Sequence, residues 1–74
     1  MIGKAIQWHI ERIGITPYKL AQRLMIGRSV VSGWVNDKKS PSYNSLKKIA
    51  KALSINVSDI VLTAEKMEKE DEIR

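Results

Sequence analysis

The apolar residues of this 74-residue chain recur at the spacing of one helix face, in short runs that stop and restart. The first run has steps of four, four and three residues and consists of Ile2, Ile6, Ile10 and Ile13. Residues three and four apart share one side of a helix, so this run predicts a helix that buries its isoleucines. Gly14 follows directly and is typical of a helix end. No segment keeps the alternation of apolar and polar residues that indicates a half-buried strand.

Capping residues mark where three later helices begin. Thr16 followed by Pro17 is typical of a helix start, and Ser42 and Asn56 can cap two further helices. A helical run also spans residues 28–36. The chain is therefore predicted to be all-α, with five short helices joined by short loops. The further residues expected in its core are Leu20, Ala21, Leu24, Val31, Trp34, Val35, Leu46, Ile49, Ala50, Leu53, Val57, Ile60 and Val61.

This pattern covers residues 1–63, which are predicted to form one domain, and residues 64–74 form a charged C-terminal tail. The tail is composed of good helix formers, and the stripe of the fifth helix can continue to about Met67. A frayed and solvated end is equally common at a chain terminus. The sequence leaves both alternatives open for the tail.

The composition excludes several kinds of chemistry. The chain has no cysteine, which excludes disulfides and thiolate metal sites. His9 lies on the inner stripe of the first helix without companion ligands, which favours a packed side chain over a metal ligand. The glycines lack the spacing of a phosphate-binding loop, so neither an enzyme nor a cofactor is expected. The longest apolar runs have three residues, whereas a membrane span needs about 20, so we expect a cytoplasmic protein with no membrane segment.

The charge is distributed unevenly along the chain. Residues 1–63 carry ten basic and three acidic side chains, a net charge of +7, whereas residues 64–74 carry a net charge of −2. The sequence pI is about 9.8. A domain with a pI above about 9 is typical of nucleic-acid binding, although some soluble proteins are basic without such a role.

The segment from Pro17 to Asn36 has the features of a helix-turn-helix. Two short helices are joined by about three residues, and Ala21 leaves room for the second helix to cross the first closely. The motifs that carry a family resemblance are Gly14-Ile15-Thr16, Leu20-Ala21-Gln22, Val31-Ser32-Gly33-Trp34, Pro41-Ser42 and Leu46-Lys47-Lys48-Ile49-Ala50-Lys51-Ala52-Leu53. From Ile6 to Val61 the chain resembles the Cro/cI-type (XRE) helix-turn-helix domains of phage repressors and small bacterial regulators.

The resemblance implies that the third helix enters the major groove of double-stranded DNA. Its base-reading positions would be Arg28, Ser29, Ser32 and Gly33. Arg28 can donate two hydrogen bonds to one guanine, or it can contact a phosphate instead. Gly33 has no side chain and would let the backbone approach the bases. Val30 would either touch a thymine methyl group or stay half-exposed without a partner.

The resemblance also implies contacts with the DNA backbone from three places. The N-terminus of the second helix can point free N–H groups at a phosphate. The loop after the third helix and the outer side of the fourth helix would contribute polar and basic side chains. The candidate phosphate-contacting residues are Thr16, Tyr18, Lys19, Asn36, Lys38, Lys39 and Lys47.

Three positions depart from the family pattern. Pro17 stands where many members have a glutamine that bridges to DNA, so one contact is missing. Met25 and Ser54 stand where glycine is frequent. A left-handed backbone at either position would cost on the order of 1 kcal/mol.

A domain of this size makes few DNA contacts, so a homodimer on a pseudo-palindromic operator is expected, acting as a repressor. The candidate dimer surface is Val61, Leu62 and Met67. The chain has no room for a small-molecule sensing site. The alternative is an antitoxin-like module that binds a partner protein through Trp8 and the acidic tail and binds DNA secondarily. A nonspecific architectural DNA-binding protein is a third, weaker alternative.

Overall fold

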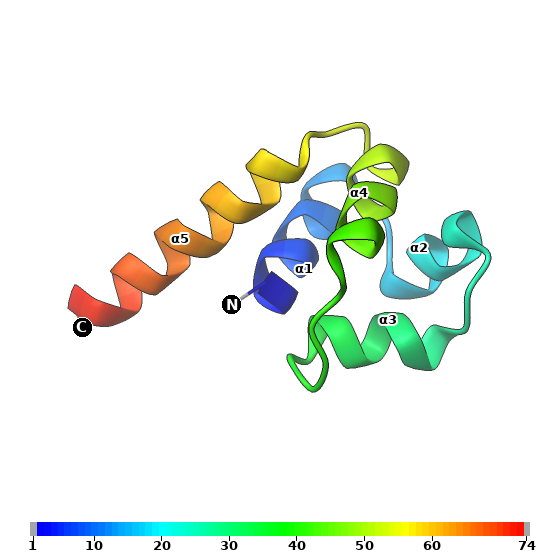
Figure 1. The fold of residues 1–74 in the computed structure, drawn as a ribbon, viewed down its shortest axis with the longest axis horizontal. Coiled ribbons are helices and arrows are strands. Elements are labelled where there is room, and N and C mark those ends of the chain that lie inside the picture. Colours follow the sequence, from blue (N-terminus) through cyan, green and yellow to red (C-terminus); the bar gives the residue numbers. More distant parts are fainter. Residues whose placement is uncertain (1, 74) are drawn as a thin grey trace.

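The computed structural model describes residues 2–73 and contains five helices in that range (Figure 1). The helices are α1 (Ile2–Ile13), α2 (Pro17–Leu24), α3 (Arg28–Val35), α4 (Tyr43–Ala52) and α5 (Val57–Ile73). No strand occurs among these residues. The structure thus confirms the predicted all-α fold with five helices.

The helices begin where the sequence places caps. The Thr16 hydroxyl accepts a hydrogen bond from the Lys19 amide at 3.1 Å, and Ser42 does the same for Ser45 at 3.1 Å. These bonds satisfy amides that have no partner within their own helix. At the start of α5 the residues exchange roles: the Asp59 carboxylate, inside the helix, accepts a hydrogen bond from the backbone amide of Asn56 at 2.8 Å. The predicted cap position at Asn56 thus contributes its backbone amide to this bond, and the side chain comes from Asp59.

Three residues other than glycine have a left-handed backbone, of which Asp37 (φ 56°) lies in the loop after α3 and the other two follow the ends of helices. Met25, after α2, has a φ of 57°, and Ser54, after α4, has a φ of 58°. The Met25 amide donates to the carbonyl groups of the last turn of α2, which is how a left-handed cap ends a helix. Met25 and Ser54 both occupy positions where glycine is frequent in the family that the sequence resembles.

The core lies between α1, α3, α4 and α5, with α2 closing one side. Helix α1 packs against α5 and α3, and α2 packs against α3 and α4. The buried apolar side chains come from all five helices and the turn after α4, and they are Ala5, Ile6, Ile10, Leu20, Ala21, Val31, Trp34, Ile49, Ala50, Leu53, Ile60 and Ala64. Nearly all of them belong to the stripes predicted from the sequence. The prediction is wrong for Ile13, which ends the first stripe and is 44% exposed.

Helix α5 is longer than its apolar stripe predicts. It continues without a break through the charged segment to Ile73, six residues beyond Met67. Ala64 is buried and Met67 packs against the core, so residue 63 does not mark the end of the packed part. The C-terminal end of α5 projects away from the other four helices (Figure 1). Of the two alternatives for the tail, the structure shows the helical one, and Arg74 lies outside the described residues.

Candidate nucleic-acid interface

Helices α2 and α3 form a compact pair joined by residues 25–27. Val31 and Trp34 face the core from α3, so the opposite side of that helix is left to solvent. The predicted base-reading residues lie on this open side: Arg28, Ser29 and Ser32 are exposed and Gly33 is half-buried. The structure therefore brings all four together on one helix surface, which we call the α3 face (Arg28, Ser29, Ser32 and Gly33).

Arg28 carries the most hydrogen-bond donors of any side chain on the α3 face, and it contacts α2. Its guanidinium carbon lies 5.0 Å from the centroid of the Tyr18 ring, in a cation–π contact. The Tyr18 hydroxyl accepts a hydrogen bond from Gln22 at 3.3 Å, which links the ring to the next turn of α2. Among residues 2–73, no acceptor is hydrogen-bonded to Arg28. Its N–H donors remain available to an external partner.

Ser32 and Asn36 contact each other at the end of α3. The side-chain nitrogen of Asn36, Nδ2, donates to the backbone carbonyl of Ser32 at 2.9 Å and to the Ser32 hydroxyl at 3.2 Å. The Ser32 hydroxyl can still donate its own proton, because it acts only as an acceptor in this pair. The sequence predicts a base contact for Ser32 and a phosphate contact for Asn36. The structure shows that the two side chains are hydrogen-bonded to each other.

The loop after α3 is fixed to the end of the helix. The Lys38 and Lys39 amides both donate to the Gly33 carbonyl, at 2.9 and 3.2 Å. Both lysines are exposed. Two predicted phosphate-contacting side chains thus stand directly beside the α3 face on an anchored backbone.

A second anchor for this loop comes from the start of the chain. The Asp37 carboxylate accepts a hydrogen bond from the Gly3 amide at 3.0 Å, at the N-terminus of α1. A helix N-terminus favours a negative charge, which suits this pairing. A Cβ atom at Gly3 would overlap the Trp34 carbonyl oxygen, so only glycine fits the close approach of α1 to α3. Sequence reasoning missed this pair because 34 positions separate its members.

The other predicted phosphate-contacting residues lie on two further elements. Thr16, Tyr18 and Lys19 are exposed at the start of α2, although the Thr16 hydroxyl is already used as a cap. Lys47 is exposed on α4, and its ammonium nitrogen lies 5.1 Å from the centroid of the Tyr43 ring. All seven predicted phosphate-contacting residues are accessible.

The predicted dimer residues differ in how much of each side chain is free. Leu62 is exposed, with 54% of its surface accessible, whereas Val61 and Met67 are half-buried. Met67 packs against the core of its own chain. Leu62 is therefore the member of this set that offers the most free apolar surface.

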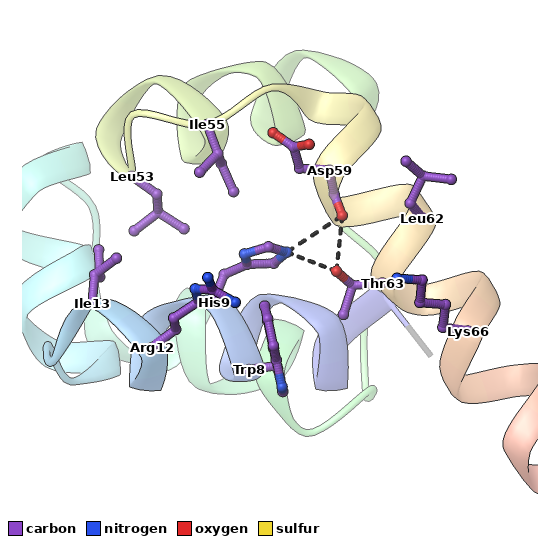
Figure 2. A pocket seen from close by; sticks show the side chains of 10 residues that line it. All are labelled: Trp8, His9, Arg12, Ile13, Leu53, Ile55, Asp59, Leu62, Thr63 and Lys66. Atoms are coloured by element: carbon purple, nitrogen blue, oxygen red, sulfur yellow. Dashed lines mark hydrogen bonds between the residues drawn. The ribbon is translucent and has the colours of Figure 1, made fainter.

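Figure 2 shows a groove between α1 and α5, which we call the α1–α5 groove. At its centre the His9 Nε2 atom lies 2.8 Å from the Thr63 hydroxyl and 3.3 Å from the Asp59 carbonyl oxygen. The Thr63 hydroxyl donates to that same carbonyl at 2.9 Å, so His9 Nε2 acts as the donor to both oxygens. His9 is 9% exposed. The prediction of a packed histidine is confirmed.

Trp8 lies at the edge of the α1–α5 groove, off the isoleucine stripe of α1. Its ring contacts the His9 ring edge-on at 4.8 Å, and the Arg12 guanidinium lies 5.2 Å from its centroid. It remains 41% exposed. Trp8 thus covers the histidine and leaves apolar surface free.

Within residues 2–73, no three side chains of the metal-ligating kinds gather in one place. None of the helices there has the length and apolar content to cross a membrane.

Comparison with known proteins agrees with the geometry of α2 and α3. A family model described as helix-turn-helix, of the Cro/C1 type, matches residues 6–60. A search of curated proteins finds no match to this sequence. The matched range contains α2, α3, the loop after α3 and the whole of α4. This chain therefore belongs to the Cro/C1-type, XRE-like helix-turn-helix family of DNA-binding regulatory domains.

Proposed function

We propose that this protein is a sequence-specific transcriptional regulator that binds a pseudo-palindromic operator as a homodimer and represses by occupying it. The observation that carries the proposal is the α3 face, where the exposed side chains of Arg28 and two serines lie beside an anchored loop with two lysines. An arginine, short hydroxyl side chains and flanking cations are the groups that bind guanine, base edges and phosphates.

In this proposal the α3 face reads bases and its surroundings bind the DNA backbone. Arg28 donates to guanine, Ser29 and Ser32 reach neighbouring base edges, and Gly33 lets the backbone approach closely. Thr16, Tyr18 and Lys19 on one side, Asn36, Lys38 and Lys39 on the other, and Lys47 on α4 contact phosphates. The net charge of +7 on residues 1–63 supports this role, since it favours association with a polyanion.

The dimer is proposed to form through α5. Leu62 supplies exposed apolar surface, Val61 lies beside it, and Met67 flanks the position where the helix leaves the core. Two-fold symmetry would place two α3 faces about 34 Å apart, one turn of DNA. Such a spacing requires an inverted repeat in the operator.

The test is selection of bound sequences from a random DNA pool, followed by titration of the best sequence and of scrambled DNA at two salt concentrations. We expect an enriched inverted repeat that binds roughly 10³-fold or more tightly than scrambled DNA. Light scattering at the same protein concentrations measures the dimer. Enrichment of no sequence, together with affinity that collapses in salt, would show that only phosphates are bound and would refute the proposal.

A second function, binding of a partner protein, is favoured by one observation. Trp8, Ile13 and Leu62 expose 41%, 44% and 54% of their surfaces around the α1–α5 groove. Aromatic residues are enriched at protein interfaces. A chain ending at Met67 separates the functions, because it keeps Ala64 and Met67 in the core. A repressor should keep its DNA preference after this truncation, whereas an antitoxin-like module that uses the acidic end of α5 should lose its partner.

A further inference from the structure

A groove lies between α2 and α4, which we call the α2–α4 groove. It is lined by Arg23, Leu24, Lys48, Lys51 and Ala52. Leu24 and Ala52 are half-buried and give the groove an apolar floor, whereas the three cationic side chains are exposed. Among residues 2–73, no acidic side chain lines this groove.

Most of the positive charge in the α2–α4 groove is free to bind. Arg23 donates from Nη1 to the backbone carbonyl of Ala52 at 3.1 Å, which holds the guanidinium over the groove and leaves most of its N–H donors available. Lys48 and Lys51 lie three residues apart on α4, and neither forms a hydrogen bond or ion pair within the described part of the chain. None of these three cations has a role in the proposed DNA contacts.

The last turns of α5 carry the opposite charge. Residues 68–72 contain four acidic side chains and one lysine, a net charge of −3, and all five are exposed. We call the four carboxylates the acidic end of α5 (Glu68, Glu70, Asp71 and Glu72), and none of them has a hydrogen bond or ion pair within residues 2–73. The last turn of α5 has no basic residue, and the C-terminal end of a helix disfavours negative charge. Cations from outside the chain would therefore stabilise this end.

The acidic end of α5 and the α2–α4 groove are too far apart to meet within one chain. The C-terminal end of α5 lies at one end of the longest axis of the molecule, and α2 lies toward the other end (Figure 1). Helix α5 is continuous from Val57 to Ile73, so its last turns do not fold back toward α2. The two features can therefore meet only between separate molecules.

We propose that the acidic end of α5 binds in the α2–α4 groove of a second copy of this chain. Its carboxylates meet Arg23, Lys48 and Lys51, and the methylene groups of its side chains cover the apolar floor. The other described acidic residues, apart from Glu65, already accept hydrogen bonds within the chain, so the acidic end is the segment with free negative charge. One helix end in one groove makes a small contact, which should be weak and sensitive to salt.

Such a contact is head-to-tail. Each copy that joins leaves one groove and one acidic end free, so association does not stop at two copies. This distinguishes the contact from the proposed dimer through Leu62, which is symmetrical and closes. The contact itself needs no DNA, although one consequence rests on the proposed function: on neighbouring operators it would join the bound dimers.

The experiment is sedimentation velocity of the full chain without DNA, over a series of concentrations at low and at physiological salt. We expect species larger than a dimer that increase with concentration and decrease with salt. The groove variant is Lys48→Glu with Lys51→Glu, and the acidic-end variant is Glu70→Lys with Glu72→Lys. All four positions are exposed, and both residue types are good helix formers, so both variants should fold. Each should weaken association beyond the dimer by about ten-fold or more.

A mixture of the two variants is the sharpest measurement. The unchanged acidic end of the groove variant meets the unchanged groove of the acidic-end variant, and the reversed end meets the reversed groove. We therefore expect an equimolar mixture to return toward wild-type association, although each variant alone has lost it. General charge repulsion predicts a different result, because the groove variant lowers the net charge from +5 to +1 and should then associate more strongly than the wild type.

Lys38→Glu with Lys39→Glu is the matched control, because it reverses two exposed lysines in the loop after α3 and gives the same net charge. We expect this control to associate as the wild type does. A loss in the control with none in the groove variant would place the acidic end on the loop after α3 and overturn the inference.

Three other results would also overturn it. They are wild-type protein that never exceeds a dimer, a groove variant that associates like the wild type, and a mixture that does not recover. A groove variant that binds scrambled DNA more weakly but associates normally would show that the groove binds phosphates instead. Because association is measured without DNA, these results leave the selection of an operator as a separate test of the proposed function.

Discussion

The α3 face and the α1–α5 groove are both hollowed surfaces with polar groups, but they use those groups in opposite ways. In the α1–α5 groove, His9 bonds to Thr63 and to the Asp59 carbonyl, and the Asp59 carboxylate bonds to the Asn56 amide. On the α3 face, Arg28 rests on a tyrosine ring and keeps its donors free. The polar groups of the α1–α5 groove bond to one another and stabilise the fold, whereas the Arg28 donors on the α3 face are available to a ligand.

This difference shows why the α3 face is a better candidate for DNA recognition than the α1–α5 groove. A buried histidine with satisfied hydrogen bonds stabilises the contact between α1 and α5, and its replacement should affect folding first. An exposed arginine adds little to the fold, and its replacement should affect binding first. The same substitution to alanine can therefore distinguish the two regions.

The largest effect is expected for His9→Ala in the α1–α5 groove. Loss of the ring leaves a cavity beside Trp8 and removes the donor to Thr63, so we expect the free energy of unfolding to fall by about 2–3 kcal/mol. Denaturant unfolding followed by circular dichroism measures this loss. In the folded fraction, the ratio of affinities for selected and scrambled DNA should not change. A change in that ratio without a loss of stability would contradict the structural role of His9.

Arg28→Ala should show the reverse pattern on the α3 face. We expect affinity for the selected DNA to fall by roughly 10- to 100-fold, because a bidentate contact with guanine is lost. Stability should stay within about 0.5 kcal/mol of the wild type, since the side chain is exposed. Repeating the selection with this variant identifies the base pair that is no longer preferred. A uniform loss on all sequences would indicate a phosphate contact instead.

Two roles can be tested at Tyr18. The sequence predicts a phosphate contact for this residue, whereas the structure places its ring against Arg28. Tyr18→Phe keeps the ring and removes the hydroxyl, whereas Tyr18→Leu removes the ring. If the ring orients Arg28, Tyr18→Leu should weaken specific binding by about two- to five-fold, and Tyr18→Phe should be close to wild type. Equal losses in both variants, on specific and scrambled DNA alike, would favour the phosphate contact.

The smallest effects are expected at the two left-handed caps, which lie near different regions. Met25 precedes the α3 face and Ser54 lies between Leu53 and Ile55, which line the groove. Met25→Gly and Ser54→Gly should each raise the free energy of unfolding by about 0.5–1 kcal/mol, because glycine adopts this backbone without strain. Thermal unfolding measures both gains. DNA affinity should be unchanged, since Met25 is 91% exposed in the turn.

The features that were predictable from the sequence are local. Helix caps at Thr16 and Ser42 act within one turn, and apolar stripes need only the period of a helix, so helix starts and core residues were accessible. The end of α5 was not, because its last turns carry charged residues whose spacing has no apolar stripe. Helix propensity alone does not decide where such a segment stops.

Within the candidate site, the sequence predicted which residues share the open side of α3 but not the contacts that support them. The contact of Tyr18 with Arg28 depends on the crossing of α2 and α3, and the bond from Gly3 to Asp37 joins residues 34 positions apart. No pattern of spacing encodes either pair. The proximity of Lys38 and Lys39 to Gly33 likewise requires the loop to return to α3, which only the three-dimensional arrangement shows.

The bond between Gly3 and Asp37 has a consequence for the motions of the loop after α3. Amides in the first turn of a helix normally exchange their protons with water quickly, because they have no partner in the helix. The Gly3 amide is instead bonded to the loop that carries Lys38 and Lys39. Its exchange rate therefore reports how often this loop detaches from α1, and a single glycine outside α3 records the opening of the surface that is proposed to meet DNA.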